Sequence, residues 1–249
     1  HWTAATDQPA EITVQTAGYD PASAGSKRSI TSLFNALLEG LMREGLLVGT
    51  YAALGSQEVA AHQPFPDGGG AKEVSFPWAK SDCVDAPRRR GALCAEALWS
   101  DPLFDLTSGV YAVQGGPENL DGVGPGGLCI SDQSRAAAMQ SGLLTPRMLS
   151  LVSGGSSEDC LATLRANGVA AVILPDIDAA TENRLNPNAP RLQKLPGVAF
   201  SDTVHAVVDN RNPNARRILN RLTDGLKEIR ISGEWYQIVQ AELSKDYIN

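Results

Sequence analysis

The chain has 249 residues, a formal net charge of −7 and a sequence pI near 5.0, and it carries no basic stripe. This charge pattern disfavours nucleic acid as a partner. Hydrophobic residues make up 43% of the chain and charged residues 20%, which is typical of a globular protein with a substantial core. No apolar run approaches the roughly 20 residues of a membrane-spanning helix, so we expect none.

The four cysteines are Cys83, Cys94, Cys129 and Cys160. None belongs to a CxxC pair and the three histidines lie well apart, so we expect no metal site. An even number of separated cysteines fits two disulfides formed in an oxidising compartment. Of the three possible pairings we favour Cys83–Cys94, which closes a loop, and Cys129–Cys160, which would tie a strand to a helix. The alternative is four buried thiols.

The N-terminal part predicts a strand, a helix and a strand in parallel β-α-β order. The expected strands are residues 12–16 and 46–51. Between them, apolar residues recur at three- and four-residue steps, which predicts a helix capped by Ser29 and ended by a left-handed Gly45. Residues 55–72, rich in proline and glycine, predict a long surface loop, and residues 72–78 predict a short strand.

The stretch from Trp99 to Val113 begins with a proline turn and then becomes β-rich. We interpret it as the connection between two α/β lobes, and the strand at residues 204–208 as the return. Two such crossings would form a hinge over a cleft. The predicted lobes are residues 1–110 with 201–249 for lobe I and residues 111–200 for lobe II.

The second lobe predicts strands that alternate with helices. Its expected strands are residues 128–130, 148–152 and 169–174, and its expected helices begin near Ser131 and Ser156. Asp176 follows the third, continuously apolar strand. The C-terminal part predicts a helix with a buried stripe from Ile218 to Ile229, in which Gly225 is a weak point, and then a short amphipathic helix.

Three segments, in this chain order, resemble family 3 bacterial extracellular solute-binding proteins over roughly residues 10–245. They are Trp99-Ser-Asp-Pro102, Cys160–Gly168 with the following strand and Asp176, and Ile231–Val239. The resemblance implies an α/β fold of the two-lobe type II periplasmic-binding class, with two hinge crossings. It implies a periplasmic or extracellular location, a small-molecule solute and, usually, delivery to a membrane permease of the ABC type. We expect a monomer without a cofactor.

The resemblance also implies where a solute would bind. Asp176 matches an aspartate that pairs the ligand's ammonium group, and the carboxyl end of a parallel strand suits such a role; a helix cap for residues 179–185 is the alternative. Ser131, Ser134 and Arg135 match a helix start that receives a carboxylate, although Arg135 also fits an exposed surface position. Tyr19 and Trp78 are candidate cleft-lining aromatic residues, with core or rim positions as the alternative.

One departure from the family pattern concerns the ligand. Amino-acid binders of this family carry a carboxylate-holding arginine shortly before the segment that begins at Trp99, and Leu93 stands at that position. Residues 88–90 are three arginines, which we interpret as a solvated charge run. We therefore expect common amino acids to bind weakly, and a different polar or cationic solute to be the ligand.

Two other functions stay open at this point. One is an accessory or scaffold protein of a periplasmic oxidation system of the methanol-oxidation type, which would work with a periplasmic dehydrogenase. The other is a dehydratase-like enzyme on the same fold, with Asp176, Glu182 or Glu73 as acid or base. We see no Ser-His-Asp order, nucleophile elbow or phosphate-binding glycine loop, so we expect no enzyme.

Overall fold

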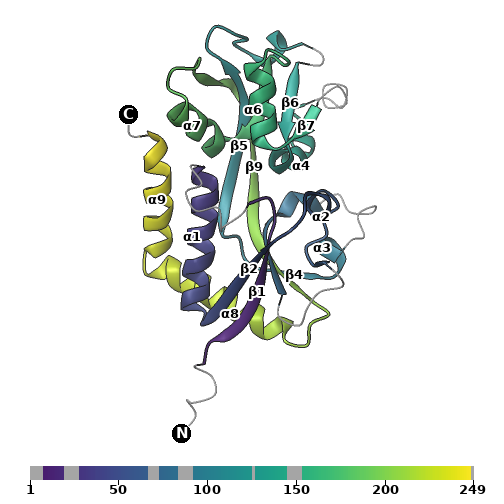
Figure 1. The fold of residues 1–249 in the computed structure, drawn as a ribbon, viewed down its shortest axis with the longest axis vertical. Coiled ribbons are helices and arrows are strands. Elements are labelled where there is room, and N and C mark those ends of the chain that lie inside the picture. The colour runs from purple at the N-terminus through teal and green to yellow at the C-terminus, as the bar shows by residue number, and fades with distance from the viewer. Residues whose placement is uncertain are drawn as a thin grey trace. The chain divides into compact units, whose positions relative to one another are not determined.

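The structure is a computed structural model, and it describes residues 8–19, 28–66, 73–83, 92–124, 127–144 and 153–247. The chain divides into two compact units. Unit 1 comprises residues 1–26, 30–104 and 203–244, and unit 2 comprises residues 27–29, 105–202 and 245–249. The strands β5 (Phe104–Val113) and β9 (Leu192–Asp209) each contain a change from one unit to the other (Figure 1). The lobe limits proposed from the sequence stay a prediction.

The sheet of unit 1 has the strand order β2-β1-β3-β9, with β4 also paired to β9. Its strands are β1 (Ala10–Thr16), β2 (Leu47–Ala53), β3 (Glu73–Ala79), β4 (Ala97–Trp99) and the end of β9. β1 pairs in parallel with β2 and β3, whereas β9 is antiparallel to β3 and β4. The helix α1 (Ser29–Glu44) connects β1 to β2, so the predicted β-α-β unit is confirmed.

Short helical segments complete the first half of unit 1. They are α2 (Ser56–Ala60), a 3-10 helix (Lys80–Cys83) and α3 (Ala92–Ala95). The expectation of a continuous loop from residue 55 is thus wrong at its start, because five residues there form a helix, and its end lies outside the described residues.

Two glycines let the backbones of α1 and α8 (Ala215–Ile231) approach closely. A methyl group on Gly225 would overlap the carbonyl oxygen of Leu41 and stand 2.9 Å from the backbone nitrogen of Gly45. A methyl group on Gly45 would overlap the carbonyl oxygen of Arg221. The interpretation of Gly225 as a weak point is therefore wrong, because its missing side chain permits the helix contact. The left-handed residue after α1 is Leu46, with φ 56°, and not Gly45 as predicted.

Unit 2 contains the strand order β9-β5-β8-β6-β7. Its other strands are β6 (Leu128–Ser131), β7 (Ser153–Gly155) and β8 (Ala171–Pro175), and β6 is parallel to both β7 and β8. Its helices are a 3-10 turn (Leu120–Gly122), α4 (Asp132–Gln140), α6 (Ser157–Arg165) and α7 (Asp176–Leu185). The strand predicted at residues 148–152 lies outside the described residues.

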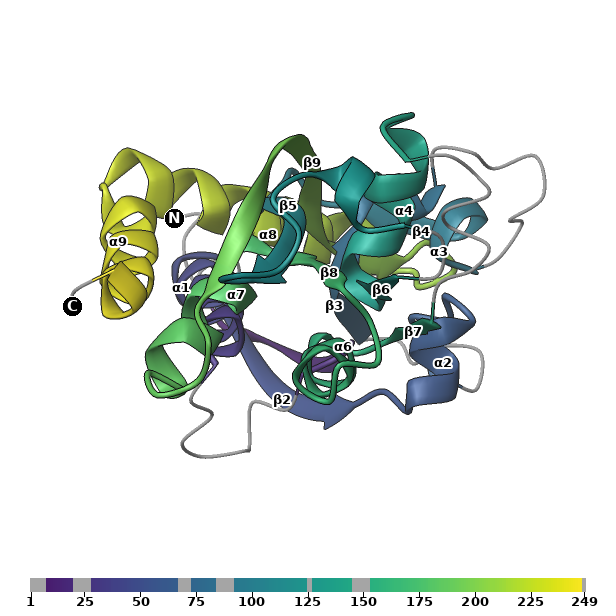
Figure 2. The same cartoon turned by 90° about the horizontal axis from the view of Figure 1, so that it is seen from above.

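Successive residues of the central strands of unit 2 point to opposite faces of its sheet. Ile130 and Ile173 belong to the core that packs under α4, whereas Cys129 and Val172 belong to the core that packs under α6 and α7. Figure 2 shows α4 on one side of β6 and β8, and α6 with α7 on the other. A continuously apolar strand such as β8 predicts a sheet that is covered by helices on both faces, as observed here.

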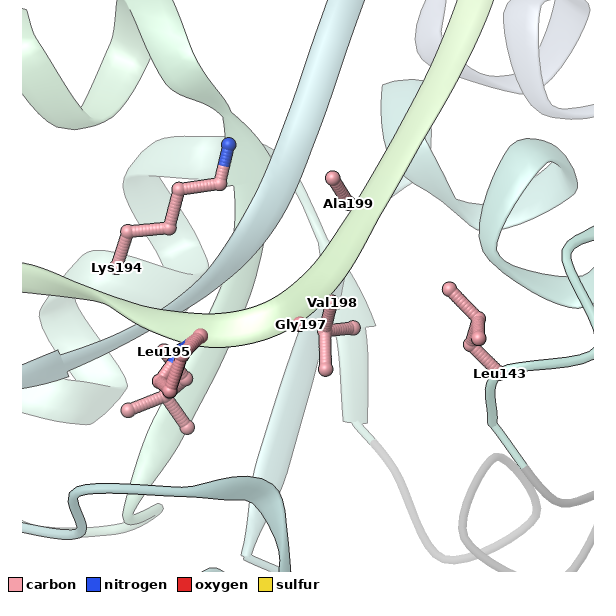
Figure 3. A pocket seen from close by; sticks show the side chains of 7 residues that line it. Leu143, Lys194, Leu195, Gly197, Val198 and Ala199 are labelled. Carbon is pink, nitrogen blue, oxygen red and sulfur yellow. The ribbon is translucent and has the colours of Figure 1, made fainter.

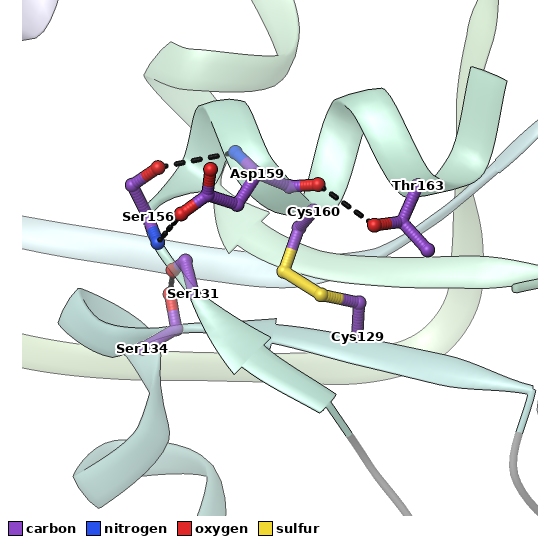
Figure 4. Close-up of a disulfide and its surroundings, with 7 residues drawn as sticks. All are labelled: Cys129, Ser131, Ser134, Ser156, Asp159, Cys160 and Thr163. Carbon is purple, nitrogen blue, oxygen red and sulfur yellow. Dashed lines mark hydrogen bonds between the residues drawn. A yellow bond between two sulfur atoms is a disulfide. The ribbon is translucent and has the colours of Figure 1, made fainter. Parts of the chain in front are cut away.

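Both favoured disulfides are present, and the described residues contain no free cysteine. Cys83–Cys94 joins the 3-10 helix to α3. Cys129–Cys160 joins β6 to α6 (Figure 4). The start of α6 is fixed by a capping box, in which the Ser156 hydroxyl accepts from the Asp159 N–H and the Asp159 carboxylate accepts from the Ser156 N–H.

Two stretches of unit 2 that are remote from its main segment in the sequence form ion pairs with α7. Arg28 donates to the carboxylate of Asp178 at 2.8 Å, and Ser157 donates to the same buried carboxylate at 2.7 Å. Arg184 donates to Asp246, near the end of α9 (Glu234–Tyr247), at 2.6 Å. Because a buried carboxylate needs such partners, Asp178 ties residues 28 and 157 to α7.

We predict that Gly225→Ala lowers the free energy of unfolding by about 3 kcal/mol, because the added methyl group forces α1 and α8 apart. Gly40→Ala is the matched control. Its methyl group would stand 3.5 Å from Ile238 Cδ1, an ordinary contact, so the gain in helix propensity should raise stability by about 0.5–1 kcal/mol. Urea unfolding of both variants measures the difference, and equal effects would contradict the close helix crossing.

We also predict that alkylation in denaturant without a reductant adds no mass to the protein, whereas reduction first exposes all four cysteines. Peptide mapping should recover the Cys83–Cys94 and Cys129–Cys160 links. Two or more cysteines that react without reduction would show that a disulfide is missing.

Candidate functional site

Three serine hydroxyls of unit 2 meet where β6 ends and α4 begins. Ser131 is the last residue of β6, and its hydroxyl donates to Ser134 at 3.1 Å. Ser134 in turn shares a hydrogen bond of 2.8 Å with Ser108 on β5. All three side chains are buried. The structure therefore brings two of the predicted site residues, Ser131 and Ser134, into one hydroxyl chain with Ser108, which sequence reasoning missed.

Charged groups surround this helix start. The side chain of Ser131 makes no capping bond to α4. Burial raises the pKa of the Asp132 carboxyl, Arg135 opposes this effect, and Asp159 raises the pKa further. Arg135 thus lies close enough to Asp132 to act on it. Because Asp132 and Asp159 place negative charge here, the helix start suits a ligand carboxylate less well than the sequence predicts.

Asp176 lies where the sequence predicts, directly after β8, and is the first residue of α7. Its Oδ1 accepts a hydrogen bond of 2.6 Å from the hydroxyl of Tyr111, on β5. Its Oδ2 accepts from the ammonium group of Lys194, on β9, at 2.9 Å. The capping alternative is wrong, because α7 already begins at Asp176, its N-cap is Pro175 and no side chain makes a capping bond; the charge of Asp176 in the first turn still favours the helix dipole. Tyr111 and Lys194 were not predicted.

An open hollow of about 500 Å³ lies along β9 in unit 2. Leu143 and residues 194–199 line it, and Figure 3 shows that the Lys194 side chain extends away from the apolar residues around it. Both apolar and polar atoms line the hollow, and the side chain of Lys194, one of its lining residues, points toward Asp176. Lys194 therefore belongs both to the wall of the hollow and to the group of residues around Asp176.

Trp78, a candidate aromatic residue of unit 1, belongs to the core. Its side chain is 3% exposed, and its indole N–H donates to Ser75 at 2.7 Å. It packs in one cluster with Leu93, which is fully buried, and with Val207. Trp78 is therefore a core residue, as the alternative interpretation held. Leu93, at the position compared with a family arginine, is a core residue as well. Residues 88–90 lie outside the described residues.

Tyr19 follows β1 in unit 1, and its ring meets Phe76 edge to face at 6.2 Å between centroids. Its hydroxyl is buried and has no hydrogen-bond partner among the described residues. Burial raises the pKa of this hydroxyl far above its usual range, and Tyr51 and Glu39 raise it further. The hydroxyl therefore stays protonated, and a buried donor without a partner is a feature that a bound ligand can explain.

Two of the acidic residues considered for catalysis, Glu182 and Asp176, are also paired. Glu182 accepts hydrogen bonds from Arg165, at 3.2 Å to Nη2, and Asp176 has the partners given above. The described part of the chain contains no group of three or more acidic, histidine or cysteine side chains that could hold a metal ion. None of its helices is both long enough and apolar enough to cross a membrane.

Among the comparisons with known proteins, only the one with solved structures found similar proteins. No protein-family model matches the sequence, and no curated protein matches it. The structure is similar to the arginine-, lysine-, histidine-binding protein ArtJ from Geobacillus stearothermophilus, at 17% identity over 93% of this chain and 94% of that chain, with a TM-score of 0.66.

Two further solved structures extend the same likeness. One is the amino acid ABC transporter substrate-binding protein AbpA from Streptococcus pneumoniae bound to L-arginine, at 10% identity over 96% of this chain and 97% of that chain, with a TM-score of 0.60. The other is the probable amino-acid ABC transporter extracellular-binding protein YtmK from Bacillus subtilis, at 11% identity over 96% and 100%, with a TM-score of 0.62. The chain therefore has the α/β, two-lobe type II periplasmic-binding fold expected from its sequence.

We predict that Ser134→Ala lowers the free energy of unfolding by about 1–2 kcal/mol, because it leaves the buried hydroxyls of Ser108 and Ser131 without their common partner. Ser201→Ala, at an exposed position of unit 2, is the control and should change stability little. Denaturant unfolding compares them. Equal stabilities of the two variants would show that the hydroxyl chain is not formed.

Proposed function

We propose that this protein is a periplasmic or extracellular solute-binding protein that closes its two lobes on a small polar solute and delivers it to an ABC-type permease. The observation that carries the proposal is a likeness to substrate-binding proteins that extends over both units, covering 93% of this chain for ArtJ and 96% for AbpA. The two disulfides support an oxidising compartment. We place the chain in a divergent branch of the family 3 extracellular solute-binding proteins.

The proposed solute contacts come from both units. In unit 2 they are Ser131, Ser134 and Arg135, where β6 ends and α4 begins, and the carboxylate of Asp176. In unit 1 the proposed contact is the hydroxyl of Tyr19, which has a proton to donate and no described partner that accepts it. Trp78 is not proposed as a solute contact, because it is only 3% exposed and packs in the core cluster with Leu93 and Val207.

An accessory role beside a periplasmic dehydrogenase is the second candidate. The burial of Leu93 and Trp78 favours it, because both positions compared with ligand-contacting residues belong to a core cluster. A catalytic role has less support, since Asp176 and Glu182 are each held by a cationic side chain.

We predict that a screen of polar metabolites by thermal shift finds a compound that stabilises the protein. A ligand at 100 times its dissociation constant should add about 2.7 kcal/mol to the free energy of unfolding. The twenty common amino acids should give little or no shift, because Leu93 cannot pair a carboxylate. Absence of a shift with every compound, together with co-purification of an oxidoreductase, would favour the accessory role instead.

We predict that Tyr19→Phe separates binding from stability. The hydroxyl is buried without a partner, so its removal should leave the stability of the ligand-free protein unchanged or slightly higher. Affinity for the solute found in the screen should fall about 5- to 10-fold, the loss of one hydrogen bond. Calorimetry on both proteins measures this, with Tyr236→Phe, an exposed tyrosine, as the control. Unchanged affinity would exclude Tyr19 from the site.

A further inference from the structure

The carboxylate of Asp176 already holds a cation from its own chain. Lys194 donates to Oδ2 at 2.9 Å and Tyr111 donates to Oδ1 at 2.6 Å, so each oxygen has one donor. The three residues come from β5, from β9 and from the start of α7, all within unit 2. About a third of each charged side chain is exposed, 37% for Lys194 and 30% for Asp176, so solutes can reach the pair.

The path of the lysine side chain depends on a glycine. Lys194 passes over β5 at Gly109, where an added methyl group would stand 2.5 Å from Cε and 3.2 Å from Cδ of Lys194. Gly109 pairs with Leu174 of β8, two residues before Asp176, which explains why the ammonium group arrives at this carboxylate. A glycine inside a strand commonly marks such a close approach.

This arrangement changes what Asp176 offers to a solute. An ammonium group on a solute would either lie beside the positive charge of Lys194, which repels it, or displace Lys194, which is attached to the same unit and so has a high effective concentration. The pair carries no net charge, but it still presents N–H donors and carboxylate lone pairs. A hydroxyl or an amide can use both kinds of group without displacing either.

We propose that Lys194 is a specificity-determining residue that excludes ammonium-bearing solutes from Asp176, so that the solute is a polar molecule without an ammonium group at this position. The inference deepens the proposed function and rests on it for the existence of a natural solute. It also replaces the expectation of a cationic solute drawn from the sequence. The exclusion by Lys194 can be tested without knowing that solute.

The test measures the affinity of L-arginine and of n-butylammonium by calorimetry at low salt. Lys194→Met removes the internal cation and should bind both probes at least tenfold more tightly than the wild-type protein. Arg191→Met is the matched control, because Arg191 is exposed, lies three residues earlier and has no ion pair with the described residues. It removes the same charge and should bind like the wild type. The double variant Lys194→Met with Asp176→Asn should bind both probes no more tightly than the wild-type protein does.

Two results would overturn the inference. One is a Lys194→Met protein, folded by circular dichroism, that binds neither probe more tightly; Lys194→Gln serves if the methionine variant does not fold. The other is a wild-type protein that binds L-arginine and loses it on Asp176→Asn. A gain in Lys194→Met without any solute for the wild type supports the inference and counts against the proposed function. If the screen finds a solute for the wild-type protein but Lys194→Met binds neither probe more tightly, the result supports the proposed function and counts against the inference.

Discussion

Parallel pairing of β6 with β7 and β8 places the starts of three helices at one edge of the unit 2 sheet. Each helix follows the carboxyl end of its strand, so the first turns of α4, α6 and α7 begin where those strands end. Free N–H groups and the positive end of the helix dipole favour polar and acidic residues there. Ser131, Ser156 and Asp176 occupy these positions for that physical reason, before any solute is considered.

The same edge also explains why the polar groups are largely paired with one another. The hydroxyl of Ser134 is shared between two serines, Asp159 completes a capping box, and Asp176 holds Lys194. Buried polar groups without partners are costly, so a pre-formed site satisfies most of its groups internally. Tyr19, in unit 1, is the exception among the candidate residues, since its buried hydroxyl has no described partner. Polar groups at the edge of the unit 2 sheet therefore already have internal partners, whereas the buried hydroxyl of Tyr19 in unit 1 has none among the described residues.

Much of this fold could be predicted from local patterns. The helical period predicts α1, the apolar run predicts β8, and Asp176 follows from the position of that run. The role of Gly225 could not be predicted, because helix propensity concerns α8 alone, whereas the close contact joins α8 to α1. Lys194 was missed because it lies 18 residues from Asp176 in the chain, and only β5, with Gly109, brings the two together. Trp78 fits a core or a cleft position equally well by residue type, and only its burial in the structure assigns it to the core.

The central claim is that Lys194 holds Asp176 and keeps it from ammonium-bearing solutes. The most direct measurement is a proton–nitrogen correlation spectrum of the lysine ammonium groups. Lys194 should give a resolved signal because its ion pair slows proton exchange, while the exposed Lys227 should not. We expect this signal to persist in excess L-arginine and to disappear in Asp176→Asn. A Lys194 signal that is absent, or that L-arginine displaces, would contradict the account.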